Sequence, residues 1–175
     1  YQDQFKGNIV YVSNNSLSKH KTNNYNDATG SKDFAKQVHV DIDNNSSTFN
    51  SSTASLSIPT NCSSIAFAGL YWSGTYPYEI GKLASNGDID LGCSDCRRED
   101  PRNIKFKLPG ATDYIDLVGT MIYDENDNEP ISNQDAYACF SDVTSLISNN
   151  ASGFNGAYTV ANIRAAINNI KDTNL

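Results

Sequence analysis

Apolar and polar residues alternate with a period of two in several short segments of this chain. Such alternation predicts β-strands that bury one face and expose the other. The strands predicted in this way cover residues 8–12, 37–42, 54–58, 104–108, 114–123, 136–140 and 157–165. Residues 65–72 are more continuously apolar, which predicts a central strand that is buried on both faces. Gly119 is expected to bend the strand at 114–123.

Helical periodicity is scarce, because much of the polarity comes from Asn, Ser and Thr, whose side chains compete for backbone hydrogen bonds. One short helix is expected at residues 143–147, with Asp142 as its cap and Asn149 and Asn150 at its end. Residues 163–171 could form a second one, although a strand is preferred for their first half. The sequence therefore predicts an all-β fold, a sandwich or jelly roll with long polar loops and at most one or two short helices.

The length of 175 residues suits a single domain, and 38% hydrophobic residues suffice for a core. A formal net charge of −7, without a basic stripe, argues against binding of nucleic acid or of an anionic membrane surface. The sequence has no apolar run of transmembrane length and no hydrophobic signal region at its start. We therefore expect no membrane insertion, and an exported protein would be represented here in its mature form.

Four cysteines in an Asn- and Ser-rich chain indicate an oxidising compartment. Cys62 and Cys139 each lie at an apolar, strand-like segment, so a disulfide between them is predicted. Cys93 and Cys96 enclose a short loop, and a local disulfide is favoured there over a redox pair or half of a zinc site. Zinc needs about four ligands and a redox pair usually begins a helix, whereas the sequence around these two cysteines is typical of a loop.

Three acidic loops offer the oxygen ligands that calcium prefers. They predict a weak structural calcium site at Asp41 and Asp43 or at Asp124 and Asp127, and no other cofactor is expected. An EF-hand is disfavoured, because Glu129 stands where the loop needs glycine. The alternative is that Asp and Asn form turns through their own side chains.

Aromatic residues cluster around the strand at 65–72. Tyr76 and Tyr78 are predicted surface contacts for a ligand, for example a sugar ring, whereas Trp72 is expected to fill the core. Catalysis is not expected. The two histidines, His20 and His39, lie in unrelated segments, and no nucleophile elbow, phosphate loop or metalloprotease motif is present.

Six blocks of this sequence carry a resemblance to a known family. They are KGNIVYVSNN at 6–15, VDID to TFNSS at 40–52, AGLYWS at 68–73, IKFKLP at 104–109, YACFSDVT at 137–144 and YTVAN at 158–162. In this order they resemble the N-terminal region of very large cell-surface adhesins of Bacteroidetes, which are exported by the type IX secretion system and are often linked to gliding motility. The Cys93–Cys96 loop departs from these blocks and looks like a local insertion.

The resemblance implies a non-catalytic β-rich domain of an adhesin on the cell surface, involved in gliding motility or attachment. Its partners would be surface, secretion or gliding-machinery proteins, an extracellular polysaccharide, or the rest of its own chain. The family continues with a Val-rich Gly-Trp strand beyond the position of Leu175, so we expect residues 1–175 to be one β-sandwich domain that lacks its last strands, a fragment of a longer chain. The alternative is a carbohydrate-binding module of a secreted degradative protein.

Overall fold

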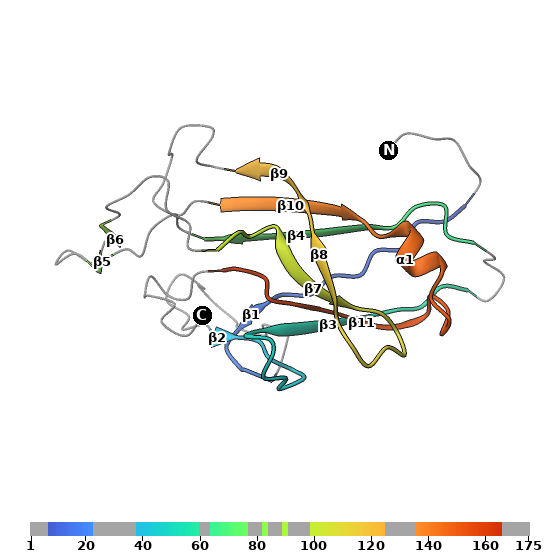
Figure 1. Ribbon diagram of the computed structural model, residues 1–175, viewed down its shortest axis with the longest axis horizontal. Coiled ribbons are helices and arrows are strands. Elements are labelled where there is room, and N and C mark those ends of the chain that lie inside the picture. Colours follow the sequence, from blue (N-terminus) through green and yellow to red (C-terminus); the bar gives the residue numbers. More distant parts are fainter. Residues whose placement is uncertain are drawn as a thin grey trace.

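The computed structural model describes residues 7–22, 38–59, 64–76, 82–83, 89–90, 99–124 and 136–165, with the backbone alone at 82–83 and 89–90. These residues form an all-β fold in which two antiparallel sheets face each other as a sandwich, as the alternating pattern predicts. Figure 1 shows the smaller sheet above the larger one, with a short helix, the one helix among the described residues, at one end. Among the described residues, no helix has the length and apolar character needed to span a membrane.

The smaller sheet has three strands in the order β4-β10-β9. Their bounds are β4 Gly69–Thr75, β10 Ala136–Asp142 and β9 Thr120–Asp124. The strand predicted at 65–72 is therefore an edge strand, and the central place belongs to β10. The prediction that it is buried on both faces is wrong, since Trp72 points inward while its neighbour Tyr71 is 63% exposed.

The larger sheet has four strands in the order β3-β11-β7-β8. Their bounds are β3 Ser51–Leu56, β11 Gly156–Ala161, β7 Asn103–Lys107 and β8 Ile115–Val118. Two small hairpin-like pairs complete the strands, β1 Leu17–Ser18 with β2 Val38–His39, and β5 Lys82–Leu83 with β6 Ile89–Asp90. β1 lies outside every strand predicted from the sequence.

The core lies between the two sheets, where inward-facing residues alternate with outward-facing ones along each strand. Its first cluster joins Trp72, Tyr76, Ile104, Tyr137 and Cys139. A second cluster, of Phe106, Leu108, Val143, Ile147 and Tyr158, carries the core toward the helix. Full burial of a side chain of this kind stabilises the fold by about 1.5–3 kcal/mol.

Gly119 marks the point where the chain passes from one sheet to the other. β8 belongs to the four-stranded sheet and β9 to the three-stranded sheet, and Gly119 is the residue between them. A Cβ atom at this position would lie 2.2 Å from Cη2 of Trp72, so the crossing brings the backbone against the indole ring. The bend predicted at Gly119 is confirmed and has a packing cause.

The short helix α1, Thr144–Ser148, lies one residue beyond its predicted range. Asp142 Oδ1 accepts a hydrogen bond from the backbone N–H of Thr144 at 2.9 Å, and Asn149 is the C-cap residue. The two hydrogen bonds from Thr144 hold the pKa of the Asp142 carboxyl below its usual value. The N-cap residue is Val143 and has no side-chain cap hydrogen bond, so the prediction of Asp142 as the cap is off by one residue, whereas the predicted end at Asn149 is confirmed.

Further predicted strands differ from the structure, and of the described residues in the strand predicted at 37–42 only Val38–His39 forms one. Residues 8–12 form no strand, and their apolar side chains are exposed, with Ile9 at 73% and Tyr11 at 85%. β11 ends at Ala161 instead of residue 165, because Asn162 takes a left-handed conformation (φ 62°) and its Oδ1 accepts the N–H of Phe49. Residues 163–165 form neither a strand nor a helix, so the strand preferred for the start of the segment 163–171 is wrong there, and residues 166–171 lie outside the described residues.

Candidate functional site

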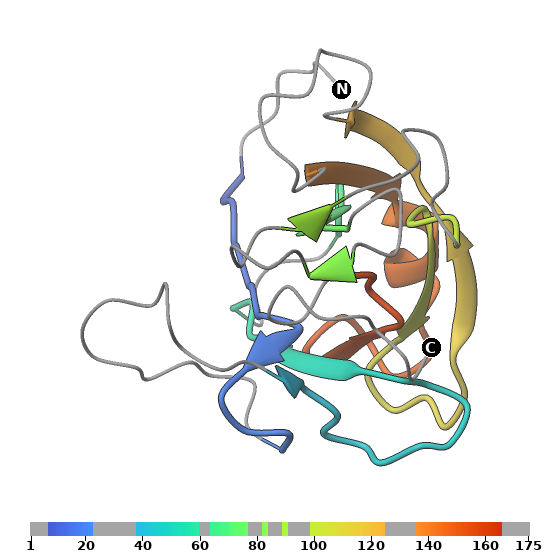
Figure 2. The ribbon, with the colours of Figure 1, turned by 90° about the vertical axis from the view of Figure 1, so that its left-hand side faces the viewer.

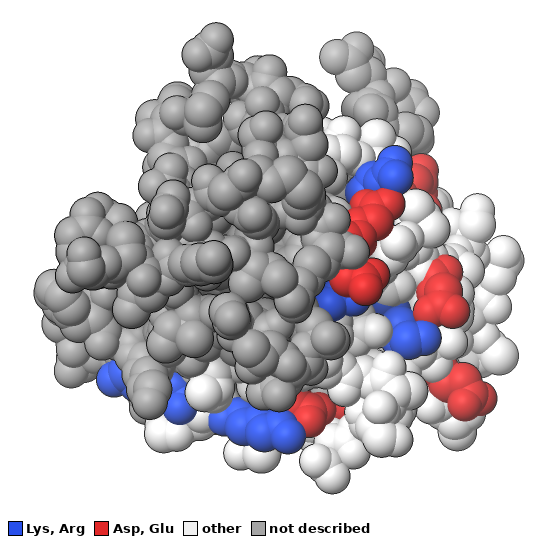
Figure 3. All heavy atoms as spheres, turned by 60° about the vertical axis from the view of Figure 1, so that its left-hand side comes forward, with Lys and Arg blue, Asp and Glu red and all other residues white. Residues whose placement is uncertain are grey.

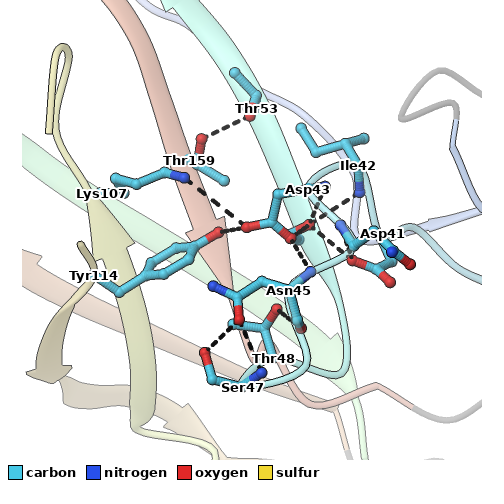
Figure 4. A network of polar contacts seen from close by, with 12 residues as sticks. Asp41, Ile42, Asp43, Asn45, Ser47, Thr48, Thr53, Lys107, Tyr114 and Thr159 are labelled. Atoms are coloured by element: carbon cyan, nitrogen blue, oxygen red, sulfur yellow. Dashed lines mark hydrogen bonds and ion pairs between the residues drawn. The ribbon is translucent and has the colours of Figure 1, made fainter. Parts of the chain in front are cut away.

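The acidic loop that follows β2 lies over the outer face of the four-stranded sheet (Figure 4). Asp43 stands at the centre of its polar network. One carboxylate oxygen accepts a hydrogen bond from Ser51 Oγ at 2.7 Å, and the other accepts one from the hydroxyl of Tyr114 and lies 3.9 Å from Lys107 Nζ. The loop is thus fastened to β3, to β7 and to the turn before β8.

Asp41 occupies the neighbouring position in this network. Its Oδ1 accepts hydrogen bonds from Ser51 Oγ at 3.3 Å and from the Asn44 N–H at 3.1 Å. Its Oδ2 lies 3.1 Å from Lys21 Nζ. Asn44 has a left-handed backbone (φ 48°), as is common where Asn forms a turn.

The electrostatics of Asp43 follow from this geometry. Partial burial alone would raise the pKa of its carboxyl, but the hydrogen bonds from Tyr114, Ser51 and Asn45, with the charge of Lys107, hold the pKa below its usual value. In return, burial and the contact with Asp43 raise the pKa of the Tyr114 hydroxyl. The pair is therefore an ionised carboxylate and a neutral phenol at neutral pH.

The predicted calcium ligands are only partly brought together. Asp41 and Asp43 meet around Ser51, with their oxygens occupied by protein donors and two lysines. Asp124 lies at the end of β9 in the three-stranded sheet, opposite Tyr137 of β10, and Asp127 lies outside the described residues. In the part of the chain that the structure describes, no group of three His, Cys, Asp or Glu side chains is placed to hold a metal ion.

The aromatic residues around β4 are arranged differently from the prediction. Tyr76 is 6% exposed and belongs to the core cluster of Trp72, so its predicted surface position is wrong. Tyr78 lies outside the described residues. Trp72 fills the core as expected, and its indole N–H donates to the carbonyl oxygen of Pro101 at 2.9 Å.

Two exposed tyrosines, Tyr71 and Tyr123, lie instead on the outer side of the three-stranded sheet, together with the half-buried rings of Phe67 and Phe140. Tyr71 of β4 stands directly opposite Phe140 of β10, and their ring centroids are 4.9 Å apart. Phe67 stacks on Phe140 from the segment before β4, with centroids 6.3 Å apart and planes at 22°. Tyr123 of β9, 44% exposed, lies opposite Ala138 on the same side. We call Phe67, Tyr71, Tyr123 and Phe140 the aromatic face.

The segment that carries Phe67 is held in place by the start of the helix. The N–H of Ala68 donates to Thr144 Oγ1 at 2.9 Å, and the N–H of Val143 donates to the carbonyl oxygen of Ala68 at 2.9 Å. Beneath the rings, a Cβ atom on Gly69 would lie 3.0 Å from both Phe140 and Tyr71, so glycine allows the rings to close over the strand. The aromatic face is thus built from fixed backbone positions.

Sequence reasoning missed this face, although a signal for it exists. Alternation along β4 puts Tyr71 on the side opposite to Trp72, and alternation along β10 puts Phe140 opposite to Cys139. Treating residues 65–72 as buried on both faces hid the outward position of Tyr71. The sequence also gave no indication that Phe67 folds back onto Phe140.

Most of the cysteines in the predicted disulfides lie outside the residues that the structure describes. Cys62, Cys93 and Cys96 lie outside the described residues, so both predicted disulfides stay predictions. Cys139 is fully buried, and its Sγ lies 3.6 Å from Sδ of Met121.

The imidazole of His39 packs edge-on against Phe49, while His20 is exposed on a different segment.

Charged side chains of both signs are interspersed on the described part of the surface drawn in Figure 3. Lys105 pairs with Asp116 at 2.7 Å, and Arg102 pairs with Asp100 at 2.7 Å. The guanidinium of Arg164 stacks over the ring of Phe49, 4.5 Å from its centroid. These basic side chains are thus paired with carboxylates or packed on a ring, and the described part of the surface in Figure 3 shows no basic stripe of the kind that binds nucleic acid.

Comparison of the chain with protein-family models, with curated protein sequences and with solved structures gives no significant match.

Proposed function

We propose that this chain is a non-catalytic extracellular domain of a large cell-surface adhesin, serving surface attachment and gliding motility. The observation that carries the proposal is the aromatic face, where Tyr71 is 63% and Tyr123 44% exposed. Exposed aromatic side chains gathered on one surface are common at binding sites, because they bring large apolar area with a polar handle. The resemblance of six sequence blocks to type IX-secreted adhesins supports the same reading.

The acidic loop has a structural role in this proposal. Its carboxylates hold the strands of the four-stranded sheet, through Ser51, Tyr114 and Lys107, on the side opposite to the aromatic face. The binding surface and the stabilising polar network would therefore occupy different sheets. The proposed partners are an extracellular polysaccharide, proteins of the cell surface or of the secretion and gliding machinery, and the rest of the parent chain.

The proposal is tested in a bacterium that encodes this chain, with an antibody against the domain. Intact cells should be labelled, and cells in which residues 7–165 are deleted from the parent gene should attach to glass and glide less well. Labelling that appears only after the cells are lysed would contradict an extracellular location. Normal attachment and gliding in the deletion strain would contradict the adhesive role.

A carbohydrate-binding module of a secreted degradative protein is the second candidate, and the aromatic face favours it as well. The two candidates differ in the parent protein. An adhesin should stay on the cells and carry no hydrolase domain, whereas a degradative protein should carry one and hydrolyse a polysaccharide. Fractionation of cells and medium, followed by activity assays on the intact parent, separates them.

A further inference from the structure

We propose that the aromatic face binds a neutral saccharide chain. This inference rests on the proposed function and names the ligand class of the same surface. Its first support is the arrangement of the rings, since Tyr71 is 63% exposed with its centroid 4.9 Å from that of Phe140, and Phe67 stacks on Phe140 with ring planes at 22°. The contact with Phe140 holds the ring of Tyr71 over the strand, and this exposed ring offers a flat apolar surface to the C–H face of a sugar ring, as aromatic side chains do to other flat groups.

The second support is the polarity around the rings. Thr120 lies opposite Phe140, Ser73 lies opposite Ala138, and Asp142 ends the same strand opposite Gly69. Thr120, Ser73 and Asp142 are all exposed. Hydroxyl and carboxylate groups at the margin of an aromatic platform can exchange hydrogen bonds with sugar hydroxyls, which a purely apolar partner would leave unused.

The third support is the charge of the face. In the described strands β4, β9 and β10 and in residues 64–68 there is no Lys or Arg, and the ionisable groups of acidic type are Asp124 and Asp142. An anionic polysaccharide or an acidic peptide would find no counter-charge here, and the net charge of −7 would repel it. The face therefore suits a neutral saccharide.

The fourth support is the size of the face. Three strands about 4.8 Å apart, with seven residues rising about 3.3 Å each, span about 330 Å². A stable protein interface buries about 800 Å² on each partner. The face is too small for a stable dimer of this chain by itself, whereas a saccharide chain needs only a strip of stacked rings.

The test compares binding of the full chain to cellohexaose, laminarihexaose and mannohexaose with binding to an alginate hexamer, by isothermal titration calorimetry. We expect binding to at least one neutral hexamer and none to alginate. Tyr71→Ala should raise the Kd about tenfold, the effect of losing one ring contact of about 1.4 kcal/mol. Tyr11→Ala is the matched control, since this tyrosine is 85% exposed on a different segment, and it should leave the Kd unchanged.

Several outcomes would overturn the inference. These are binding to none of the neutral hexamers, an equal Kd for the wild type and Tyr71→Ala, or binding to alginate alone. Concentration-dependent dimers in sedimentation that Tyr71→Ala abolishes would show that a second copy occupies the face. Circular dichroism checks that Tyr71→Ala is folded, and Tyr123→Ala, at a second exposed position, gives an independent variant. The labelling and attachment experiments test the proposed function without any of these sugars. The proposed function and the saccharide inference can therefore fail separately.

Discussion

Gly119 is a residue whose lack of a side chain is required by packing. A Cβ atom there would lie 2.2 Å from the indole ring of Trp72 and 3.1 Å from the carbonyl oxygen of Phe140, so it is confined on two sides. The ring of Trp72 cannot move away freely, because its N–H is bonded to Pro101. We expect Gly119→Ala to lower the free energy of unfolding by about 3 kcal/mol, as overpacking of a core does.

Urea denaturation followed by circular dichroism measures this effect. The matched control is Gly153→Ala, where the added Cβ meets no atom within 4 Å. Its backbone is left-handed (φ 77°), so this control should cost about 1 kcal/mol from conformation alone. Equal losses in the two variants would show that the contact with Trp72 is unimportant.

Asp43 is the second residue with a clear prediction. Asp43→Asn removes the negative charge that accepts hydrogen bonds from Ser51 and Tyr114 and faces Lys107. We expect a loss of about 1–3 kcal/mol in the free energy of unfolding at pH 7, typical of hydrogen bonds to a charged group. Asp116→Asn, at an ion pair whose carboxylate side chain is 81% exposed, should change it by less than about 1 kcal/mol.

The pH dependence of the same variant gives a second readout. The pKa of Asp43 is lower in the folded protein than its usual value, so its ionisation stabilises the fold at neutral pH. This contribution is complete above the unfolded pKa of about 4 and disappears as the pH falls through the lower folded pKa. The difference in stability between the wild type and Asp43→Asn should therefore shrink below about pH 4. A stability difference between the two proteins that stays constant down to pH 2 would contradict this role of the Asp43 charge.

At the scale of elements, the segment at residues 8–12 tests the limits of sequence patterns. It has the apolar composition of a strand, yet Ile9 and Tyr11 are mostly exposed and the segment joins no sheet. The double variant Ile9→Ser/Tyr11→Ser should therefore change the free energy of unfolding by less than about 0.5 kcal/mol. Ile104→Ala, in β7 and 3% exposed, should cost about 2–5 kcal/mol in the same urea titration. A loss of more than 1 kcal/mol in the double variant would show that the segment packs in solution.

Elements with strong local signals could be predicted from the sequence. Alternation of Ile104 and Phe106 with lysines places β7 and its inward face, and Asp142 marks the start of the helix. These features depend on neighbours in the chain, so a local pattern carries them. The same holds for the bend at Gly119, between β8 and β9.

Elements whose place depends on distant partners could not be predicted. An apolar run does not reveal whether a strand has neighbours on both sides, and β4 became an edge strand for that reason. For the same reason the sequence predicts a buried Tyr71 and an exposed Tyr76, whereas the structure shows the opposite. Only the packing of the sheets decides which of the two rings is covered. The hydrogen bond from Tyr114 to Asp43 also joins residues that lie far apart in the chain, and such a contact cannot be inferred from the spacing of residue types in the sequence.

At the scale of the whole molecule, the two long sides of the sandwich are covered differently. On one side, the continuous run of β8 and β9 passes from sheet to sheet, and the N-terminal segment 7–16 lies on the opposite side (Figure 2). A side-chain hydrogen bond joins Asn14 of this segment to the backbone of Thr53 in β3. The sheets are thus covalently continuous on one side, whereas on the other side the N-terminal segment is hydrogen-bonded to the four-stranded sheet.

The disulfide predicted between Cys62 and Cys139 belongs to this scale, because it would tie the central strand β10 to the segment before β4. A bridge that closes a long loop stabilises a fold by about 4 kcal/mol, so addition of a reductant should lower the urea midpoint markedly. Peptide mapping without reduction should recover the linked peptides. Alkylation of both thiols in the unreduced, denatured protein would show that the bridge is absent.

Trp72 is the single tryptophan of the chain, and its ring lies between the sheets beside Gly119. All intrinsic indole fluorescence therefore comes from one place, the contact between the two layers. A dry indole emits at shorter wavelength than a hydrated one, so separation of the layers would appear as a red shift even if each sheet kept its strands. The native protein thus carries an optical reporter of its own assembly, without any added label.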